Sequence, residues 1–311
     1  MRMLGLCFIL SLPLMAGCEF LKHNKTKSIV APPQDLGNGL PSSDKLIGYL
    51  NREADKLSVI ESNDVSLVAN VQGRRMPGLT GTMLCEKPRN FRLTGDAVAT
   101  QYVDIGSNGD QFWFWVKDGD SPLYFCSYAD YEKGAKLPLP FQPEWVVQAL
   151  GMAKYDPAKE YKVVAKGDTY ELVENTTVQG IPVRKSTIFN ARNVTDPTQP
   201  QVVGHVIQNA QTGKTILHAT IRRMRYASYS SPEGERSVAY PSDILLEWPE
   251  EKLSMTMKIG KATVNHKLTT EEENRYFTIP NWPNIKAVDL ARLRPTGDPT
   301  SRDIRQAGGI R

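Results

Sequence analysis

The hydrophobic and polar positions of this chain follow two periods: one helical stretch, and then a long series of short strands. Five apolar residues recur at three- and four-residue spacing near the start, with charged residues between them: Leu46, Leu50, Ala54, Leu57 and Ile60. This spacing predicts an amphipathic helix, with Ser42 or Ser43 as its N-cap. Its apolar stripe requires an apolar surface to cover.

After this helix, apolar and polar residues alternate. In residues 64–72, Val65, Leu67, Ala69 and Val71 share one face, and Gly, Asn and Asp separate the segments that follow. Short alternating segments of this kind indicate antiparallel strands joined by hairpins. Few long helices are present to make the crossovers that a parallel sheet needs.

Two further segments have helical character. Pro143 stands at the first turn of a predicted helix over residues 144–150, and residues 269–280 read as a helical or irregular closing piece. A hairpin turn is expected at residues 209–213. The fold class is therefore mainly β, with eleven to thirteen antiparallel strands around two or three helices. Such a sheet can curl into an incomplete barrel.

The N-terminus has the organisation of a secretory signal. Arg2 precedes an apolar run too short to span a bilayer, and Ala16 and Gly17 precede Cys18. Residues 15–18 resemble the lipobox of bacterial lipoproteins. That resemblance implies cleavage before Cys18 and its acylation with chains such as palmitate, which would anchor the protein in a membrane. The alternative is an ordinary cleaved signal peptide with a chance cysteine.

These features divide the chain into four parts. We expect a lipoprotein signal peptide at 1–17, a lipid-anchored tether at 18–42, a β half-barrel domain at 43–293 and a disordered tail at 294–311. The protein would then lie in the cell envelope and face the periplasm. We favour the outer membrane over the inner membrane, although an acidic residue after the cysteine favours inner-membrane retention in some bacteria.

The charge balance argues against a nucleic-acid partner. The full chain has 38 Lys and Arg against 34 Asp and Glu, and removal of the signal peptide takes away only Arg2, which lowers the net charge from +4 to +3. A nucleic-acid-binding protein is expected to have a clustered basic face. The basic run at 221–225 has the pattern of a solvated strand face instead.

Two of the four cysteines remain in the mature domain. Cys7 leaves with the signal peptide and Cys18 is used for lipid, so Cys85 and Cys126 are left in an oxidising compartment. An even number outside the cytosol suggests a disulfide. Buried free thiols in strands are equally compatible with the pattern.

No catalytic motif stands out. The chain has no CxxC, GxSxG, Walker A or GxGxxG sequence, and His23, His205, His218 and His266 lie in separate segments without metal-ligand spacing. We therefore expect a protein that is not an enzyme and has no cofactor or metal. A Ser-His-Asp triad remains open, because its members need not be neighbours in sequence.

Aromatic residues gather in two adjacent strands. One strand pair cannot hide all of them on one face, so either both faces are covered or one face lines an apolar pocket. They are Phe112, Trp113, Phe114, Trp115, Tyr124 and Phe125.

The order of two short motifs resembles the LolA/LolB-like family of periplasmic lipoprotein carriers and receptors. The first is a basic-Pro-x-x-Phe-Arg corner at residues 87–92, and the second is Ser-Asn-Gly-x-x-Phe-Trp at residues 107–113. The region from 45 to about 118 carries the resemblance best. Residues 240–265 share the strand pattern of the family's final strands.

The resemblance implies a fold, a function and a set of site residues. The fold is an unclosed antiparallel half-barrel of about eleven strands, covered by helices. Its hydrophobic cavity would hold acyl chains of a lipid or lipoprotein without catalysis. Residues 137–141 would insert into the membrane or fold over the core. The ligand and lid residues would be Lys87, Phe91, Arg92, Phe112, Trp113, Phe114 and Trp115.

Within this set, Lys87 matches the basic residue that holds the lid in the carrier, and Arg92 would pin the lid or meet a lipid headgroup at the rim.

The first alternative function is a scaffolding lipoprotein that binds protein partners, and the second is an envelope hydrolase. The sequence leaves the oligomeric state and the client open.

Overall fold

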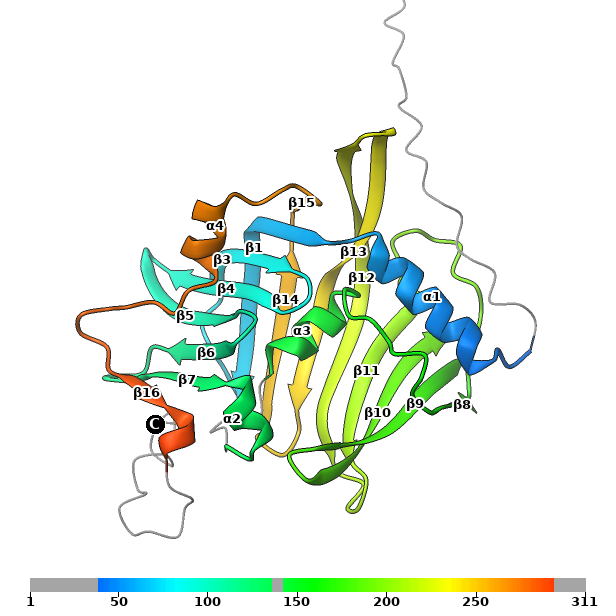
Figure 1. The fold of residues 1–311 in the computed structure, drawn as a ribbon, viewed down its shortest axis with the longest axis horizontal. Helices are drawn as coiled ribbons and strands as arrows, with labels where there is room; N and C mark the ends of the chain where they lie inside the picture. The colour runs from blue at the N-terminus through cyan, green and yellow to red at the C-terminus, as the bar shows by residue number, and fades with distance from the viewer. Residues whose placement is uncertain (1–38, 136–141, 294–311) are drawn as a thin grey trace, which may run out of the picture.

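A single large sheet forms the body of the molecule (Figure 1). The computed structural model describes residues 39–135 and 142–293. Within them, sixteen strands and four α-helices are present, with one 3-10 helix. None of these helices is long and apolar enough to cross a membrane.

The strands run almost entirely antiparallel. They are β1 (Val59–Val71), β2 (Arg74–Arg75), β3 (Leu79–Glu86), β4 (Asn90–Ala97), β5 (Thr100–Ser107), β6 (Gln111–Val116), β7 (Leu123–Ser127), β8 (Tyr161–Lys166), β9 (Thr169–Val178), β10 (Ile181–Asn190), β11 (Val202–Asn209), β12 (Thr215–Ser231), β13 (Gly234–Trp248), β14 (Leu253–Ile259), β15 (Thr263–Val264) and β16 (Ala287–Asp289).

The order across the sheet is β16-β7-β6-β5-β4-β3-β1-β14-β13-β12-β11-β10-β9-β8, and β2 and β15 pair with β1 outside this path. Only β16 runs parallel to its neighbour, β7. Because β8 and β16 stand at opposite edges and do not pair, the sheet stays open. The predicted unclosed antiparallel half-barrel is confirmed.

The sheet has more strands than the alternation predicted. Three of the sixteen have only two or three residues: β2, β15 and β16. Segments this short cannot show a two-residue period, so they are invisible in sequence. The remaining thirteen lie at the upper end of the expected range.

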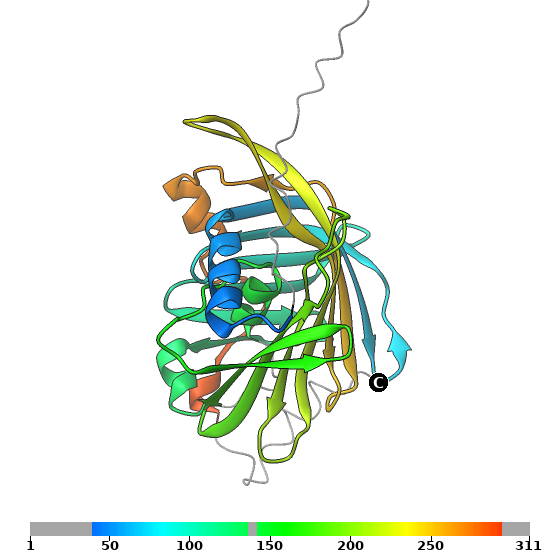
Figure 2. The ribbon, with the colours of Figure 1, turned by 90° about the vertical axis from the view of Figure 1, so that its right-hand side faces the viewer.

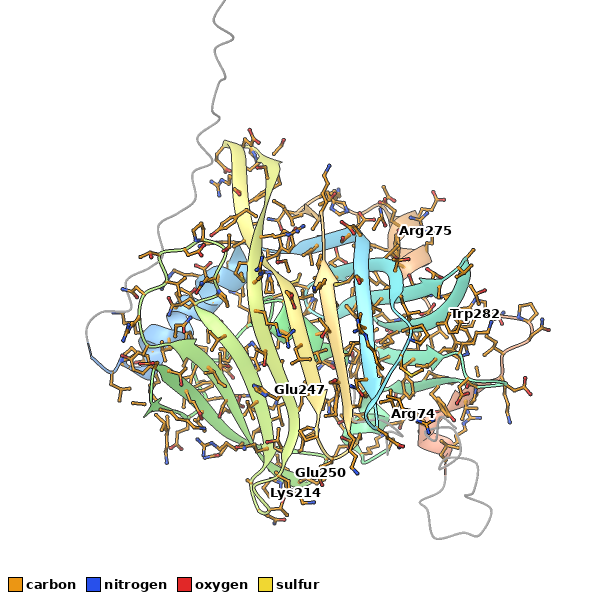
Figure 3. All side chains as sticks on the ribbon, turned by 180° about the vertical axis from the view of Figure 1, so that it is seen from behind. Arg74, Lys214, Glu247, Glu250, Arg275 and Trp282 are labelled. Atoms are coloured by element: carbon orange, nitrogen blue, oxygen red, sulfur yellow. The ribbon has the colours of Figure 1, made fainter. Side chains whose placement is uncertain are left out.

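The helices lie on both sides of the sheet. They are α1 (Ser43–Asp55), α2 (Tyr128–Glu132), α3 (Pro143–Ala149), α4 (Thr270–Tyr276) and the 3-10 helix η1 (Leu290–Arg292). The sheet curls, and α1 and α3 lie on its concave side (Figures 1 and 2). Seen from behind, the convex side is largely open between Glu247 and Arg74, and α4 and the Trp282 segment lie over one end of it (Figure 3).

Helix α1 is shorter than the apolar stripe predicted. The Ser42 side chain accepts a hydrogen bond from the Lys45 backbone N–H, which confirms the N-cap. The helix ends at Asp55, and Ile60 lies on β1 opposite Cys85. The β-branched pair Val59 and Ile60 favours a strand, and both residues remain buried there.

The main core fills the space between α3 and the curled sheet. The buried side chains of α3 and the residues after it pack on concave-facing residues of the central strands, including Phe91, Leu93 and Met257. Phe91 and Leu93 have no exposed surface, so both side chains point into the core. A second cluster joins Leu46, Ile47 and Leu50 of α1 to Leu172 and Phe189.

Candidate functional site: the concave face beneath α1

The aromatic strand β6 divides its side chains between the two faces of the sheet. On the concave side, Phe112 contacts the rings of Tyr128 and Tyr131 at centroid distances of 5.4 and 5.8 Å. On the convex side, Trp115 contacts the Trp282 ring at 5.1 Å. Both faces of the strand are therefore covered.

This packing favours the alternative in which both faces are covered, and a ligand role for the strand stays a prediction. Neither of the two cavities described below is lined by Phe112, Trp113, Phe114 or Trp115. Phe91 does not line them either, because it is enclosed in the main core. The reason is that α2, α3 and the 277–285 segment supply enough apolar surface to cover this half of the sheet.

The two cysteines of the domain are free thiols, so the suggested disulfide is corrected. Cys85 lies on β3 and Cys126 on β7, with three strands between them. At about 4.8 Å per strand spacing, four spacings place them roughly 19 Å apart, whereas a disulfide needs Cα atoms within about 7 Å. Both are buried, and burial raises the pKa of the Cys126 thiol to about 11.

Lys87 holds one end of α1. It lies in the turn between β3 and β4, and its ammonium donates a hydrogen bond to the backbone carbonyl of Ala54 at 2.7 Å. Burial lowers the pKa of Lys87, and the nearby Asp55 carboxylate opposes this change. The residue named from sequence as a lid holder thus contacts the helix that covers the concave face.

Two more contacts fasten α1, and sequence reasoning missed them. The Asn51 side chain exchanges two 2.8 Å hydrogen bonds with the backbone of Tyr155, and Lys154 forms a 2.6 Å ion pair with Asp55. These partners lie about a hundred residues from α1 in sequence. No local pattern signals such a pairing.

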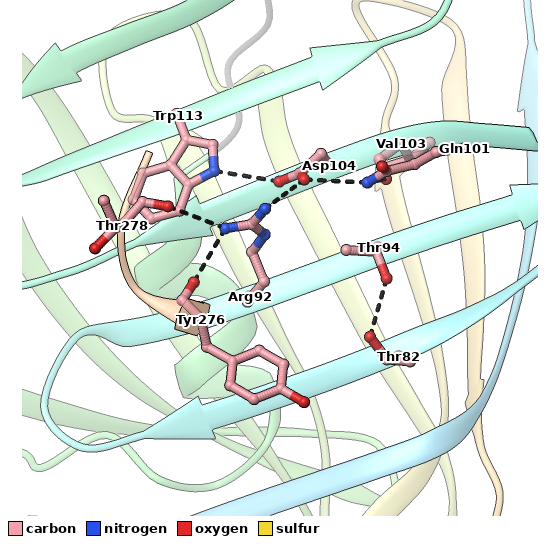
Figure 4. Close-up of polar contacts among 9 residues, drawn as sticks. All are labelled: Thr82, Arg92, Thr94, Gln101, Val103, Asp104, Trp113, Tyr276 and Thr278. Carbon is pink, nitrogen blue, oxygen red and sulfur yellow. Dashed lines mark hydrogen bonds and ion pairs between the residues drawn. The ribbon is translucent and has the colours of Figure 1, made fainter. Parts of the chain in front are cut away.

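Arg92 does not act on the concave side. Its guanidinium faces the convex side, where it forms a 2.5 Å ion pair with Asp104 (Figure 4). It also donates to the carbonyls of Tyr276 and Thr278, each at 3.1 Å. Arg92 therefore pins the segment after α4, and its expected place at a lid or lipid headgroup on the rim of the cavity is corrected.

The Asp104 carboxylate is the buried centre of this cluster. It has no exposed surface, and it accepts further hydrogen bonds from the Trp113 indole at 3.2 Å and the Gln101 amide at 3.1 Å. Burial raises the pKa of Asp104, and Arg92 opposes the rise. The alternation of Phe91, Arg92 and Leu93 explains the split: the flanking residues face the core, so Arg92 faces away.

A cavity of about 90 Å³ lies beneath α1. Its apolar wall is formed by Leu50, Leu57, Leu150, Ile221, Met224 and Ala239. Ligand pockets usually enclose about 300 Å³ or more, so the large apolar cavity expected from the sequence is reduced here to a small remnant. The cause is α3, whose side chains occupy the centre of the concave face.

A chain of polar groups runs along one side of this cavity. The Gln148 amide donates to the Tyr155 hydroxyl at 2.8 Å, which shares a 2.7 Å hydrogen bond with the Thr187 hydroxyl. Thr187 in turn lies 3.2 Å from Nδ1 of His205. Burial lowers the pKa of His205 to about 4, so the imidazole is neutral at pH 7.

A larger, polar cleft of about 590 Å³ adjoins this cavity. Gln148, Ala153 and Tyr155 belong to the walls of both spaces. Aromatic and charged side chains dominate the cleft, among them Arg89, Tyr128, Glu144, Tyr161, Glu174 and Lys185. Such a lining suits a polar group more than a hydrocarbon chain.

Neither space contains a His-carboxylate-Ser arrangement. His205 contacts Thr187. His218 lies 3.5 Å from Glu247; the side chains of His218 and Glu247 are partly exposed, and neither residue lines either of the two spaces. Across residues 39–135 and 142–293, no three His, Cys, Asp or Glu side chains are grouped to hold a metal ion. Cys18 and residues 137–141 lie outside the described residues.

The open antiparallel sheet covered by helices is the architecture that the resemblance to the LolA/LolB-like family implies. No protein-family model matches the chain, and no curated protein matches it either. Solved structures with a similar fold include a LolA superfamily protein from Nitrosomonas europaea, with 10% identity, a TM-score of 0.42, and coverage of 75% of this chain and 97% of that one.

Two others are a DUF1329 family protein from Desulfovibrio piger and an outer membrane lipoprotein-sorting protein domain from Vibrio parahaemolyticus. The first has 11% identity, a TM-score of 0.42, and coverage of 76% of this chain and 95% of that one. The second has 6% identity, a TM-score of 0.45, and coverage of 75% and 98%. Likeness at this level is one of fold alone, so the function must be argued from the geometry of this chain.

Proposed function

We propose that this chain is an envelope lipoprotein that binds an acyl chain of a lipid or of a lipidated protein beneath α1. It would be anchored through acylated Cys18 and the 18–42 tether, with the 43–293 domain facing the periplasm and the outer membrane as the favoured site. The role is that of a non-catalytic carrier or receptor.

The observation that carries the proposal is the attachment of α1. Its apolar residues Leu46, Ile47 and Leu50 cover other apolar residues of the sheet, and Leu50 also lines the cavity. In its C-terminal half, Asn51, Ala54 and Asp55 fasten the helix through polar contacts with other segments of the domain.

A bound acyl chain could take the place of α1 on the apolar surface that the helix covers. The cavity of about 90 Å³ is too small for a long chain, so α1 must move outward to admit one. Each buried methylene stabilises the bound state by about 0.8 kcal/mol, which offsets the loss of helix contacts. The ligand and the helix would compete for one apolar surface.

Saturable fatty-acid binding by the full-length Cys18→Ala variant, which needs no detergent, tests the proposal. We expect displacement of a fluorescent fatty acid and a 1:1 complex in native mass spectrometry. Ala239→Leu adds volume to the cavity lining and should weaken binding, whereas the same change at Ala287, exposed on edge strand β16, should not. Absence of saturable binding would refute the proposal.

A further inference from the structure

A lysine interrupts the row of concave-facing residues on β10. Val183, Lys185, Thr187 and Phe189 alternate on this face, and Val183 and Phe189 are fully enclosed in the cores beside it. Lys185 instead projects into the wall of the 590 Å³ cleft. A cation at such a position is costly unless an anion compensates it.

The described residues compensate the charge of Lys185 only in part. Glu174 and Glu144 are the carboxylates that raise its pKa, and each forms an ion pair with another side chain. Glu174, directly across the strand pair from Lys185, forms a 2.8 Å ion pair with Lys159, and Glu144 lies 3.7 Å from Arg89. No carboxylate of the described residues lies within 4.0 Å of the Lys185 ammonium.

We propose that the polar cleft binds the anionic head of an amphiphile at Lys185 while its chain enters the cavity beneath α1. The ligand class is a single molecule with a carboxylate or phosphate head and an acyl chain. This inference rests on the proposed function and adds to it a charge requirement and a second subsite.

The geometry connects the two subsites over a short distance. Thr187 lies two residues from Lys185 on the same face, about 7 Å along the strand, and it belongs to the polar chain beside the cavity. Tyr155 stands in the shared wall and touches Thr187 through its hydroxyl. A head group at Lys185 therefore places the first methylenes of the chain at Tyr155, between the cleft and the cavity. Displacement of α1, with loss of the contact between Asn51 and Tyr155, would let the chain enter the cavity.

The setting of Lys185 favours an anion at this position. Burial lowers the pKa of Lys185, which reflects incomplete compensation of its charge. The lining as a whole is balanced, so the preference for an anion rests on Lys185; its charged members are Arg89, Lys154, Lys159 and Lys185 against Glu132, Glu144, Asp156 and Glu174. A bound anion would gain a charge-assisted hydrogen bond in a partly buried setting.

Four ligands with the same twelve-carbon chain test the inference: dodecanoate, dodecyl phosphate, dodecanol and dodecyltrimethylammonium. We expect both anions to bind at least tenfold more tightly than the alcohol or the cation, as one charge-assisted hydrogen bond implies. The comparison of dodecanoate with dodecyl phosphate identifies which anionic head is preferred.

Lys185→Met should weaken binding of the anions about tenfold or more and leave dodecanol binding within twofold. Lys185→Arg should retain the preference. Lys162→Met is the matched control, because Lys162 is exposed on the convex side of the nearby strand β8. Thermal unfolding of each variant, followed by circular dichroism, establishes that the fold persists.

The outcomes separate the inference from the proposed function. If all four ligands bind equally, or if Lys185→Met retains the anion preference, the inference is overturned and acyl binding stands. If no ligand binds, the proposed function fails as well.

Discussion

The ammonium of Lys87 lies 2.7 Å from the carbonyl oxygen of Ala54, so the turn between β3 and β4 is joined to the last turn of α1. Carbonyls in the last turn of a helix lack intrahelical partners, and a cation there is favourable for the helix dipole. One side chain thus satisfies a helix end and fixes the position of the helix over the concave face.

Lys87→Met should loosen α1 without unfolding the sheet. Loss of this hydrogen bond costs about 1 kcal/mol, which corresponds to roughly fivefold faster amide exchange in α1. Hydrogen exchange read by mass spectrometry would measure it. Lys56→Met is the control, since the Lys56 side chain is more exposed and pairs with Glu53 of the same segment; an equal effect there would contradict the latch role.

The contact between Lys87 and the helix was expected from the family resemblance, whereas the other contacts that fasten α1 could not be predicted from the sequence. The basic-Pro corner marks Lys87, and the apolar stripe marks α1. The contacts of Asn51 with Tyr155 and of Asp55 with Lys154 join segments about a hundred residues apart, and nothing local encodes them. The packing of α3 on the concave face likewise depends on tertiary contacts, which the hydrophobic periodicity of the sequence does not determine.

Arg92 illustrates the same limit. Its position between Phe91 and Leu93 predicts that it faces away from the core, which excludes a role on the concave side. That argument was available from alternation alone. Its partners Asp104, Tyr276 and Thr278 were not, because the last two are 184 and 186 residues away.

Arg92→Met should strongly destabilise the domain. The substitution leaves the Asp104 carboxylate buried without its cation, which typically costs about 3–5 kcal/mol. Urea unfolding would measure the loss, and adding Asp104→Asn to Arg92→Met should recover part of it. Arg275→Met, at a position whose guanidinium stacks on Tyr276, should change stability by less than about 0.5 kcal/mol. A small effect at Arg92 would contradict its role as a pin.

His205 should make the protein less stable in acid. Burial lowers its pKa from 6.5 to about 4, so between these values the unfolded chain takes up a proton that the folded protein does not. The free energy of unfolding should therefore fall as the pH decreases from about 6.5 to 4, by about 3 kcal/mol in total. His205→Gln should remove this component in denaturant titrations at pH 7 and pH 4.5; an identical pH slope in the variant would contradict the assignment.

Cys18→Ala should abolish acylation of the protein. Without the thiol, no acyl chain can be attached at this position. Metabolic labelling with an alkyne palmitate analogue should mark the parent chain and not the variant. Cys85→Ala should retain the label, because that thiol is buried in the core. Labelling that survives Cys18→Ala would contradict the proposed anchor.

Photo-crosslinking with a diazirine fatty acid, applied to the full-length protein in its membrane, tests acyl-chain binding beneath α1 most directly. The predicted result is label on peptides that contain Leu50, Leu150 or Met224, from three sides of the cavity, and its loss with excess unlabelled fatty acid. Label confined to peptides outside the concave face, or label that unlabelled fatty acid does not compete away, would contradict the account.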